Sequence, residues 1–160
     1  MRPLLLLSVF SLLVGCDQVT KHAATTLLID APAVVVDGVF ELRYAENRDT
    51  AFSLVNQLGL GEPPSWVMAL LSTLAFALIG AALWRQRHDA TRLHLAAMVL
   101  IASGAVANLI DRFARGFVVD FLPIRGWPIF NVADVLIVLG IVAWLSASRS
   151  GYAPVPDEPD

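Results

Sequence analysis

The sequence predicts a mainly α-helical membrane protein with four transmembrane helices and a small antiparallel β-sheet between the first two. Three observations support this fold class. Hydrophobic residues make up 57% of the 160 residues and charged residues only 16%, whereas soluble domains are about 25% charged. Four apolar stretches each approach the roughly 20 residues that cross a bilayer. A segment between the first two stretches is rich in residues that favour β-strands.

The four predicted spans differ in how clearly their ends are marked. They cover residues 3–16 with a more polar continuation to residue 29, then residues 66–84, 93–110 and 129–148. The second span contains 19 uncharged residues and has a tryptophan at each end, which is typical of a helix that meets both membrane interfaces. An even number of spans places both ends of the chain on the same side of the membrane.

Basic residues predict which side that is. The short loop between the second and third spans contains Arg85, Arg87 and Arg92, and short loops rich in Lys and Arg favour the cytoplasm. Both termini are therefore predicted to be cytoplasmic. Residues 1–150 are expected to form a single integral membrane domain, and residues 151–160, which are rich in proline and acidic residues, a disordered cytoplasmic tail.

Residues 30–64 are predicted to carry the β-structure on the outer side. The runs 34–36 and 39–44 are rich in β-branched and aromatic residues and flank Asp37-Gly38, a dipeptide favoured in tight hairpin turns. Apolar and charged residues alternate in the second run, so one face of the sheet is expected to lie on the membrane surface. Residues 63–65, Pro-Pro-Ser, are expected to break the chain and cap the second span.

Polar side chains lie inside or at the ends of these spans, and the predicted topology brings them to one depth near the outer leaflet. They are Asp17, Lys21, Asn108, Asp111, Arg112, Asp120, Asn131 and Asp134. A charged residue at the centre of a membrane helix costs about 2.5–3.5 kcal/mol on insertion scales. A group of such residues at one depth therefore indicates a functional site.

Neighbouring charges divide the carboxylates into two kinds. Lys21 lies one helical turn after Asp17, while Arg112 and Arg115 lie beside and one turn after Asp111. A nearby cation keeps a carboxylate ionised, so these two acids are predicted to be structural rather than catalytic.

Asp120 and Asp134 have no basic neighbour in the sequence. Two carboxyl groups held together in a low-dielectric place share one proton. The ionised member can then activate water while the protonated member donates to a carbonyl oxygen. The residues therefore favour aspartic proteolysis, with a structural hydrogen-bonded pair as the alternative for the same two side chains.

Five short motifs follow one another between residues 17 and 134. They are Asp17-Gln-Val-Thr-Lys21, Glu46-Asn47 through Ala51-Phe52-Ser53, Asn108-Leu-Ile-Asp-Arg112, Val118-Val-Asp120-Phe121 and Phe130-Asn-Val-Ala-Asp134. In this order they resemble the motifs of the bacterial lipoprotein signal peptidases, signal peptidase II. The resemblance implies that Asp120 and Asp134 are the catalytic residues. The residues implied to support the site or bind substrate are Asp17, Lys21, Asn47, Asn108, Asp111, Arg112, Asn131 and Ala133.

The resemblance also implies a substrate, a prolipoprotein with diacylglyceryl on its cysteine, cut just before that cysteine. It implies four helices with a periplasmic β-cradle, a bacterial inner membrane location, contact with membrane lipid, and no metal or organic cofactor. A nucleic-acid partner is not expected, because the net charge is −3 and basic residues are scattered. Two positions depart from the family pattern. Arg48-Asp49-Thr50 replaces a loop that usually reads x-Gly-Ala, which bears on substrate preference, and Ala107 stands where glycine commonly precedes Asn108.

Two other functions remain open at the level of the sequence. Leu13-Val-Gly-Cys16 after an apolar run resembles a lipobox, so the chain could itself be a membrane-anchored lipoprotein. Carboxylates inside membrane helices also occur in small transporters and proton-relay proteins. Transport, however, predicts polar residues through the full depth of the membrane, whereas the inner halves of these spans are apolar.

Overall fold

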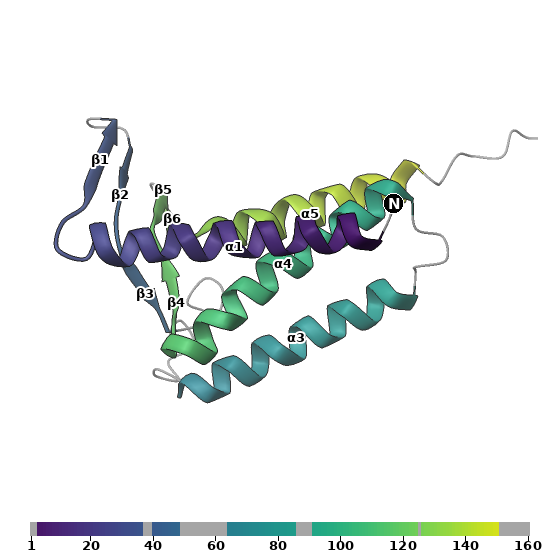
Figure 1. The fold of residues 1–160 in the computed structure, drawn as a ribbon, viewed down its shortest axis with the longest axis horizontal. Helices are drawn as coiled ribbons and strands as arrows, with labels where there is room; N and C mark the ends of the chain where they lie inside the picture. The colour runs from purple at the N-terminus through teal and green to yellow at the C-terminus, as the bar shows by residue number, and fades with distance from the viewer. Residues whose placement is uncertain (1–2, 37–39, 49–63, 86–90, 125, 151–160) are drawn as a thin grey trace, which may run out of the picture.

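A computed structural model describes residues 3–36, 40–48, 64–85, 91–124 and 126–150. Its helices are α1 (Pro3–Leu27), α3 (Ser65–Arg85), α4 (Arg92–Arg115) and α5 (Val132–Ser150). Its strands are β1 (Ala33–Val36), β2 (Phe40–Leu42), β3 (Ala45–Asn47), β4 (Val118–Asp120), β5 (Leu122–Ile124) and β6 (Trp127–Phe130). The helices run alongside one another, and all the labelled strands gather at one end of them (Figure 1).

Three helices in the described part of the chain, α1, α4 and α5, are long and apolar enough to cross a membrane. Large apolar side chains on the helices face outward; Leu4 of α1 is 75% exposed and Leu78 of α3 is 63% exposed. In water such surfaces would be unfavourable, whereas hydrocarbon accommodates them. The chain is therefore a mainly helical, membrane-integral protein.

The helix α3 corresponds to the predicted second span and contains 21 residues. Within it, the described apolar stretch is shorter, Trp66–Ala75. The helix begins at Ser65 after Pro64, whose carbonyl oxygen accepts hydrogen bonds from the backbone N–H groups of Val67 and Met68. Pro64 thus marks the start that the sequence predicted.

Two predicted span boundaries were wrong. The third helix does not end at residue 110 but continues to Arg115, where Gly116 closes it in the left-handed conformation with φ 80°. The fourth does not begin at Ile129, because residues 129 and 130 belong to β6 and α5 starts at Val132. At the end of α4 hydropathy was misleading because the polar residue Asp111 is satisfied by Lys21 and Arg115. At the start of α5 it was misleading because the apolar residues 129 and 130 belong to a strand.

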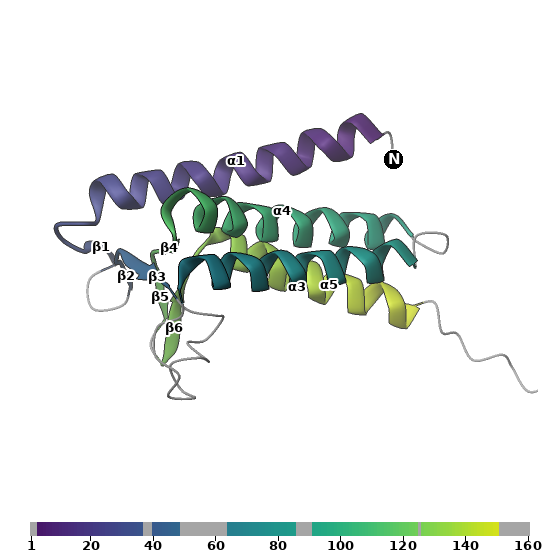
Figure 2. The same ribbon diagram turned by 90° about the horizontal axis from the view of Figure 1, so that it is seen from below.

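The helix α4 packs against α1, α3 and α5 and lies between α1 and the other two in the view of Figure 2. The helices α4 and α5 come close together at two glycines. A Cβ atom on Gly104 would lie 2.3 Å from the Ala133 carbonyl oxygen, and one on Gly140 would lie 2.6 Å from Cγ1 of Ile101. Small residues at a helix interface allow backbones to come together in membranes. The first turn of α5 is consequently held directly against α4.

The β-structure comprises three two-stranded antiparallel sheets in the described residues. The predicted hairpin is present as β1 and β2, with Ala33 opposite Leu42 and Val34 opposite Glu41. Its proposed turn, Asp37-Gly38, lies outside the described residues. The rest of the segment does not extend this sheet, because β3 pairs with β4 from beyond α4, and β5 pairs with β6.

The predicted β-structure between the first two helices is therefore present, and the strands beyond α4 were not predicted. Strands β4, β5 and β6 have three or four residues each, too short for a periodic signal. Residues Ala24, Leu28, Val119 and Phe121 form a buried apolar cluster that packs the end of α1 against β4. This cluster, and the β3–β4 pairing, fix Asp120 at the end of the helices.

Candidate active site

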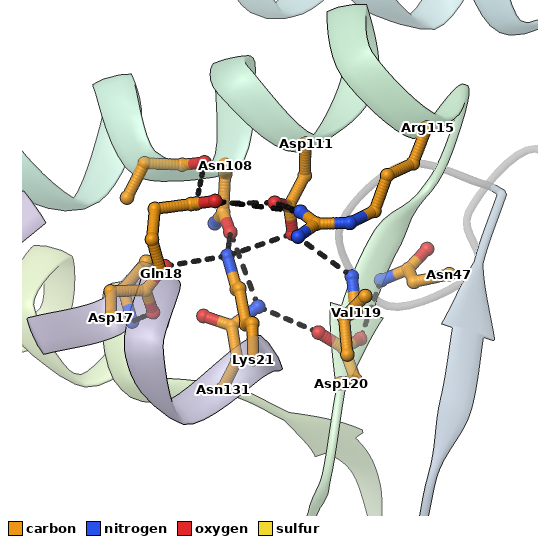
Figure 3. A network of polar contacts seen from close by, with 12 residues as sticks. Asp17, Gln18, Lys21, Asn47, Asn108, Asp111, Arg115, Val119, Asp120 and Asn131 are labelled. Carbon is orange, nitrogen blue, oxygen red and sulfur yellow. Dashed lines mark hydrogen bonds and ion pairs between the residues drawn. The ribbon is translucent and has the colours of Figure 1, made fainter. Parts of the chain in front are cut away.

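A buried group of charges joins α1 to α4 at the strand end of the helices. The Lys21 ammonium lies 2.8 Å from Oδ2 of Asp17 and 3.1 Å from Oδ2 of Asp111. Arg115 pairs with the other oxygen of Asp111. The side chains of Asp17, Lys21 and Asp111 are fully buried, and two acids here balance two bases (Figure 3). Buried ions are tolerated when they are paired in this way.

The two buried carboxylates also accept hydrogen bonds from backbone N–H groups of neighbouring elements. Oδ1 of Asp17 accepts a hydrogen bond of 2.7 Å from the N–H of Ala133, in the first turn of α5. A carboxylate is favourable there, because the N-terminus of a helix carries partial positive charge. Oδ2 of Asp111 accepts from the N–H of Val119 in β4 at 3.1 Å. The predicted Asp17–Lys21 pair is thus confirmed. Asp17 connects α1 to α5, and Lys21 connects α1 through Asp111 to β4.

Of the two cations predicted to neutralise Asp111, Arg115 is confirmed as its partner, whereas the predicted pairing with Arg112 was wrong. Among the described residues, the cations within 4 Å of the Asp111 carboxylate are Lys21 and Arg115. Successive residues on a helix point about 100° apart, whereas residues four apart share a face. Arg112 is partly exposed and lies within electrostatic range of the Asp134, Asp120 and Asp111 carboxylates, with the strongest interaction to Asp134.

Asp120 ends β4 and is only 2% exposed. Its Oδ1 accepts a hydrogen bond of 2.6 Å from the side-chain amide of Asn131, and its Oδ2 accepts one of 2.9 Å from that of Asn47 in β3. Burial raises the pKa of Asp120 to about 6, and the nearby Asp134 carboxylate contributes to the same rise, while the two amide donors oppose it. Asp120 thus keeps its proton up to a pH of about 6, well above the range of an ordinary aspartate.

Asp134 lies in the first turn of α5 and is partly exposed. Its Oδ1 accepts a hydrogen bond of 2.9 Å from the side-chain amide of Asn108, and its Oδ2 accepts one of 3.2 Å from the backbone N–H of Asn131. The Oδ1 of Asn131 in turn accepts from the N–H of Asp134 at 3.0 Å. This reciprocal arrangement is a capping box, so Asn131 caps α5 and fixes the orientation of Asp134.

Two side-chain amides connect the two aspartates. The Asn131 amide nitrogen that donates to Asp120 also donates to Oδ1 of Asn108 at 3.1 Å. The Asn108 nitrogen then donates to Asp134. Lys21 adds a further hydrogen bond of 2.8 Å to the same Asn108 oxygen. The structure therefore brings both aspartates, both asparagines and the buried ion group into one network.

The remaining predicted residues take different positions in this network. Asn47 reaches Asp120 from the neighbouring strand, and Ala133 is fully buried, with its N–H on Asp17 and its carbonyl oxygen against Gly104. Arg48 lies 5.2 Å from the centre of the Phe117 ring and pairs with Glu46. Residues 49 and 50 of the departing loop lie outside the described residues.

The sequence did not single out Gln18 or Gly104. Gln18 donates hydrogen bonds of 3.1 Å to the Ala107 carbonyl oxygen and to Oδ1 of Asp111. The available signal for Gln18 was its position next to Asp17. The available signal for Gly104 was a glycine within an otherwise apolar helix. Within the described part of the chain, no group of three His, Cys, Asp or Glu side chains is arranged to hold a metal ion.

Known proteins were compared with this chain at the levels of sequence and fold. The family model described as signal peptidase (SPase) II matches residues 9–149. A lipoprotein signal peptidase of Azoarcus sp. (strain BH72) is 36% identical over 148 residues, which cover 88% of this chain and 81% of the relative. A lipoprotein signal peptidase of Clostridioides difficile (strain 630) is 37% identical over 144 residues, which cover 87% of this chain and 90% of the relative.

Two solved structures, both described as bacterial membrane enzymes, share the fold. The first has a TM-score of 0.77 and 21% identity over 100% of this chain and 97% of its own. The second has a TM-score of 0.75 and 23% identity over 95% of this chain and 97% of its own. The residues matched by the family model include all members of the buried network. The chain belongs to the signal peptidase II family.

Proposed function

We propose that this protein is an aspartic lipoprotein signal peptidase that cuts diacylglyceryl-modified prolipoproteins immediately before the lipidated cysteine. The relatives' names support the substrate class. One observation carries the catalytic type: Asp120 and Asp134, from different elements, are joined through the amides of Asn108 and Asn131. Such an arrangement can hold two carboxyl groups and one shared proton in fixed positions.

The two aspartates take different roles in the proposed reaction because their surroundings differ. Asp134 is partly exposed and, in its ionised form, removes a proton from a water molecule. Asp120 is 2% exposed, with a pKa of about 6, and in its protonated form donates to the scissile carbonyl oxygen. The water oxygen adds to the carbonyl carbon and gives a neutral tetrahedral diol.

Collapse of this intermediate regenerates the starting protonation state. A diol hydroxyl returns its proton to Asp120 as the C=O bond re-forms, and Asp134 gives its proton to the departing nitrogen as the C–N bond breaks. The products are a peptide acid and an amine, and the two aspartates again hold one proton between them. Arg112, which lies near Asp134, is proposed to donate hydrogen bonds to the peptide backbone of the substrate.

The remaining parts of the topology belong to the same proposal. We take α3 as the fourth span, because it has 21 residues and runs alongside the other helices (Figure 1). Arg85 ends α3 and Arg92 begins α4, at the same end of the bundle as the start of α1 and the end of α5. By the positive-inside rule this end is cytoplasmic. The site then lies at the periplasmic face of the bacterial inner membrane, in a single domain formed by residues 1–150.

The experiment that tests the proposed function is cleavage by the purified protein in detergent. Two prolipoprotein substrates are compared, identical except that one carries diacylglyceryl on its cysteine. The lipidated substrate is expected to yield a fragment that begins with the modified cysteine, identified by mass spectrometry, and the unmodified one to remain intact. Equal cleavage of both would indicate a general membrane protease, and cleavage of neither would overturn the proposal.

The two alternatives are not favoured by the structure. The lipobox-like residues 13–16 lie within the continuous helix α1, and the residue that follows, Asp17, is fully buried in the ion network. Loss of residues 1–15 with a lipid adduct, seen by mass spectrometry of the intact chain, would support the lipoprotein interpretation. A transporter would need polar groups along the membrane depth, whereas the buried charged residues described here gather at the strand end of the helices.

A further inference from the structure

We propose that Lys21 is a positioning residue for the peptidase reaction: its ammonium group sets the orientation of the Asn108 amide and, through it, the hydrogen-bond donors that reach both aspartates. This inference rests on the proposed function of Asp120 and Asp134. It gives Lys21 a task beyond neutralising Asp17 and Asp111.

The orientation follows from the chemistry of the three groups around Asn108. An ammonium group has donors and no acceptor, so the 2.8 Å contact from Lys21 requires the amide oxygen of Asn108 to face it. The amide nitrogen then faces Oδ1 of Asp134 at 2.9 Å. The opposite orientation would set N–H groups against the ammonium and an oxygen against the carboxylate. Lys21 therefore excludes it.

The same constraint extends to Asn131. Its amide nitrogen donates one proton to the Asn108 oxygen at 3.1 Å and the other to Oδ1 of Asp120 at 2.6 Å. A reversed Asn108 would present a donor to this nitrogen and break the connection. Within the described residues, no ion pair within 4 Å joins Lys21 to either Asp120 or Asp134. Its charge acts on Asp120 from a distance, and its hydrogen bonds reach the two aspartates through the amides.

The contact to Asn108 is not required for charge balance. Lys21 already has two carboxylate partners, Asp17 and Asp111, and Asp111 has Arg115 as a second cation. The third hydrogen bond instead goes to Asn108 (Figure 3), whose amide nitrogen donates to Asp134. A cation on an amide oxygen also polarises the amide, which strengthens its N–H donors. Lys21 is thus placed both to orient Asn108 and to strengthen its bond to Asp134.

The test is a double-mutant cycle between Lys21 and Asn108, carried out in the wild-type chain. Asp17 is kept, because its two oxygens accept from the Ala133 N–H and from Lys21, and an amide at this position would set N–H groups against one of them. The four proteins are wild type, K21M, N108L and K21M/N108L, each assayed on the lipidated substrate and each checked by thermal unfolding. The cycle separates the Lys21–Asn108 interaction from the effect of either residue alone.

Removal of Lys21 is expected to lower kcat by about 10-fold to 100-fold when Asn108 is present, because small displacements of reacting groups carry such factors, with a smaller change in KM. In the N108L background the same removal is expected to change kcat by less than about 2-fold. An equal loss in both backgrounds would overturn the inference and leave Lys21 a purely structural role. If K21M does not fold, D17N/K21M and D17N/K21M/N108L replace K21M and K21M/N108L, because loss of one acid and one base keeps the net charge of the site.

A second readout does not depend on turnover. The protonation of Asp120 is followed by infrared spectroscopy of its carboxyl group, assigned by its absence in D120N. Removal of Lys21 is expected to move the midpoint to higher pH, and by more when Asn108 is present than in N108L. If removal of Lys21 shifted the midpoint equally with and without Asn108, the inference would be contradicted. If no protein cleaves the lipidated substrate, the proposed function fails, while this titration still decides the positioning. The side chains that face Asp120 are Lys21 from α1, Arg112 from α4, Asp134 from α5, and the amides of Asn47 and Asn131.

Discussion

Replacing Gly104 by alanine is expected to displace Asp134 without touching it. The added Cβ atom would lie 2.3 Å from the Ala133 carbonyl oxygen and 2.8 Å from Cγ1 of Ile137, whereas ordinary contacts begin at 3.4 Å. The backbone oxygen cannot rotate away, so the first turn of α5 has to move by about 1 Å. Asp134 follows Ala133 directly and moves with it.

Two effects of different size are expected. Overpacking of a tight interface destabilises proteins by about 1–3 kcal/mol, and a displacement of about 1 Å at a reacting group lowers rates by up to about 100-fold. The free energy of unfolding is measured by thermal or denaturant unfolding in detergent, and kcat is measured on the lipidated substrate and normalised to the folded fraction. G104A is expected to lose on both measurements.

Two further glycines provide matched controls. A Cβ on Gly140 would meet Cγ1 of Ile101 at 2.6 Å and the Ala97 carbonyl oxygen at 2.9 Å, but Gly140 lies six residues beyond Asp134, about 9 Å along the helix. G140A is therefore expected to lose stability while its folded molecules keep their kcat. Gly80 has nothing within 4 Å of such a Cβ, so G80A is expected to lose neither. A folded G104A with wild-type kcat, or an equal kcat loss in G140A, would refute the reasoning.

Two other predictions concern the buried acids. Asp17→Ala is expected to lower the free energy of unfolding by about 3–5 kcal/mol, because it breaks a buried ion pair and leaves the Ala133 N–H without its acceptor; an unchanged melting temperature together with lost activity would instead assign Asp17 to the reaction. Because burial raises the pKa of Asp120 from an ordinary 3.8 to about 6, the folded chain holds this proton more tightly than the unfolded chain, and up to about 3 kcal/mol of stability present near pH 4 is lost as the pH rises through 6. Melting temperatures of wild type and D120N at several pH values test this, and the same pH dependence in both proteins would count against the raised pKa.

The sequence predicted the helices well and their ends poorly, for one physical reason. Long apolar runs are sufficient to predict helices in a membrane, because every backbone group must be satisfied within the segment. The ends depend on tertiary partners. Asp111 extends α4 beyond the apolar run because Lys21 and Arg115 neutralise it, and Asn131 leaves the predicted span because its side chain caps α5.

Non-local contacts account for what the sequence missed in the site. Predicting the ion pair of Asp17 with Lys21 required only a spacing of four residues. In contrast, the hydrogen bond from Asn47 to Asp120 joins positions 73 residues apart. The strands that carry these residues are too short for their pairing to be predicted. The hydrogen bond from Lys21 to Asn108 was also not predicted from the sequence, since these residues lie 87 positions apart. The sequence showed that Asp120 and Asp134 lack a basic neighbour. It did not show that the amides of Asn108 and Asn131 connect them.

The most direct test of the account is the rate of a single turnover on lipidated prolipoprotein by D120N and by D134N, each shown to be folded by its unfolding transition. In the proposed reaction one aspartate donates a proton and the other accepts one. An amide side chain can do neither. Each variant is therefore expected to be slower than wild type by at least about 100-fold. Turnover near the wild-type rate by either folded variant would contradict the claim that these two carboxyl groups carry out the hydrolysis.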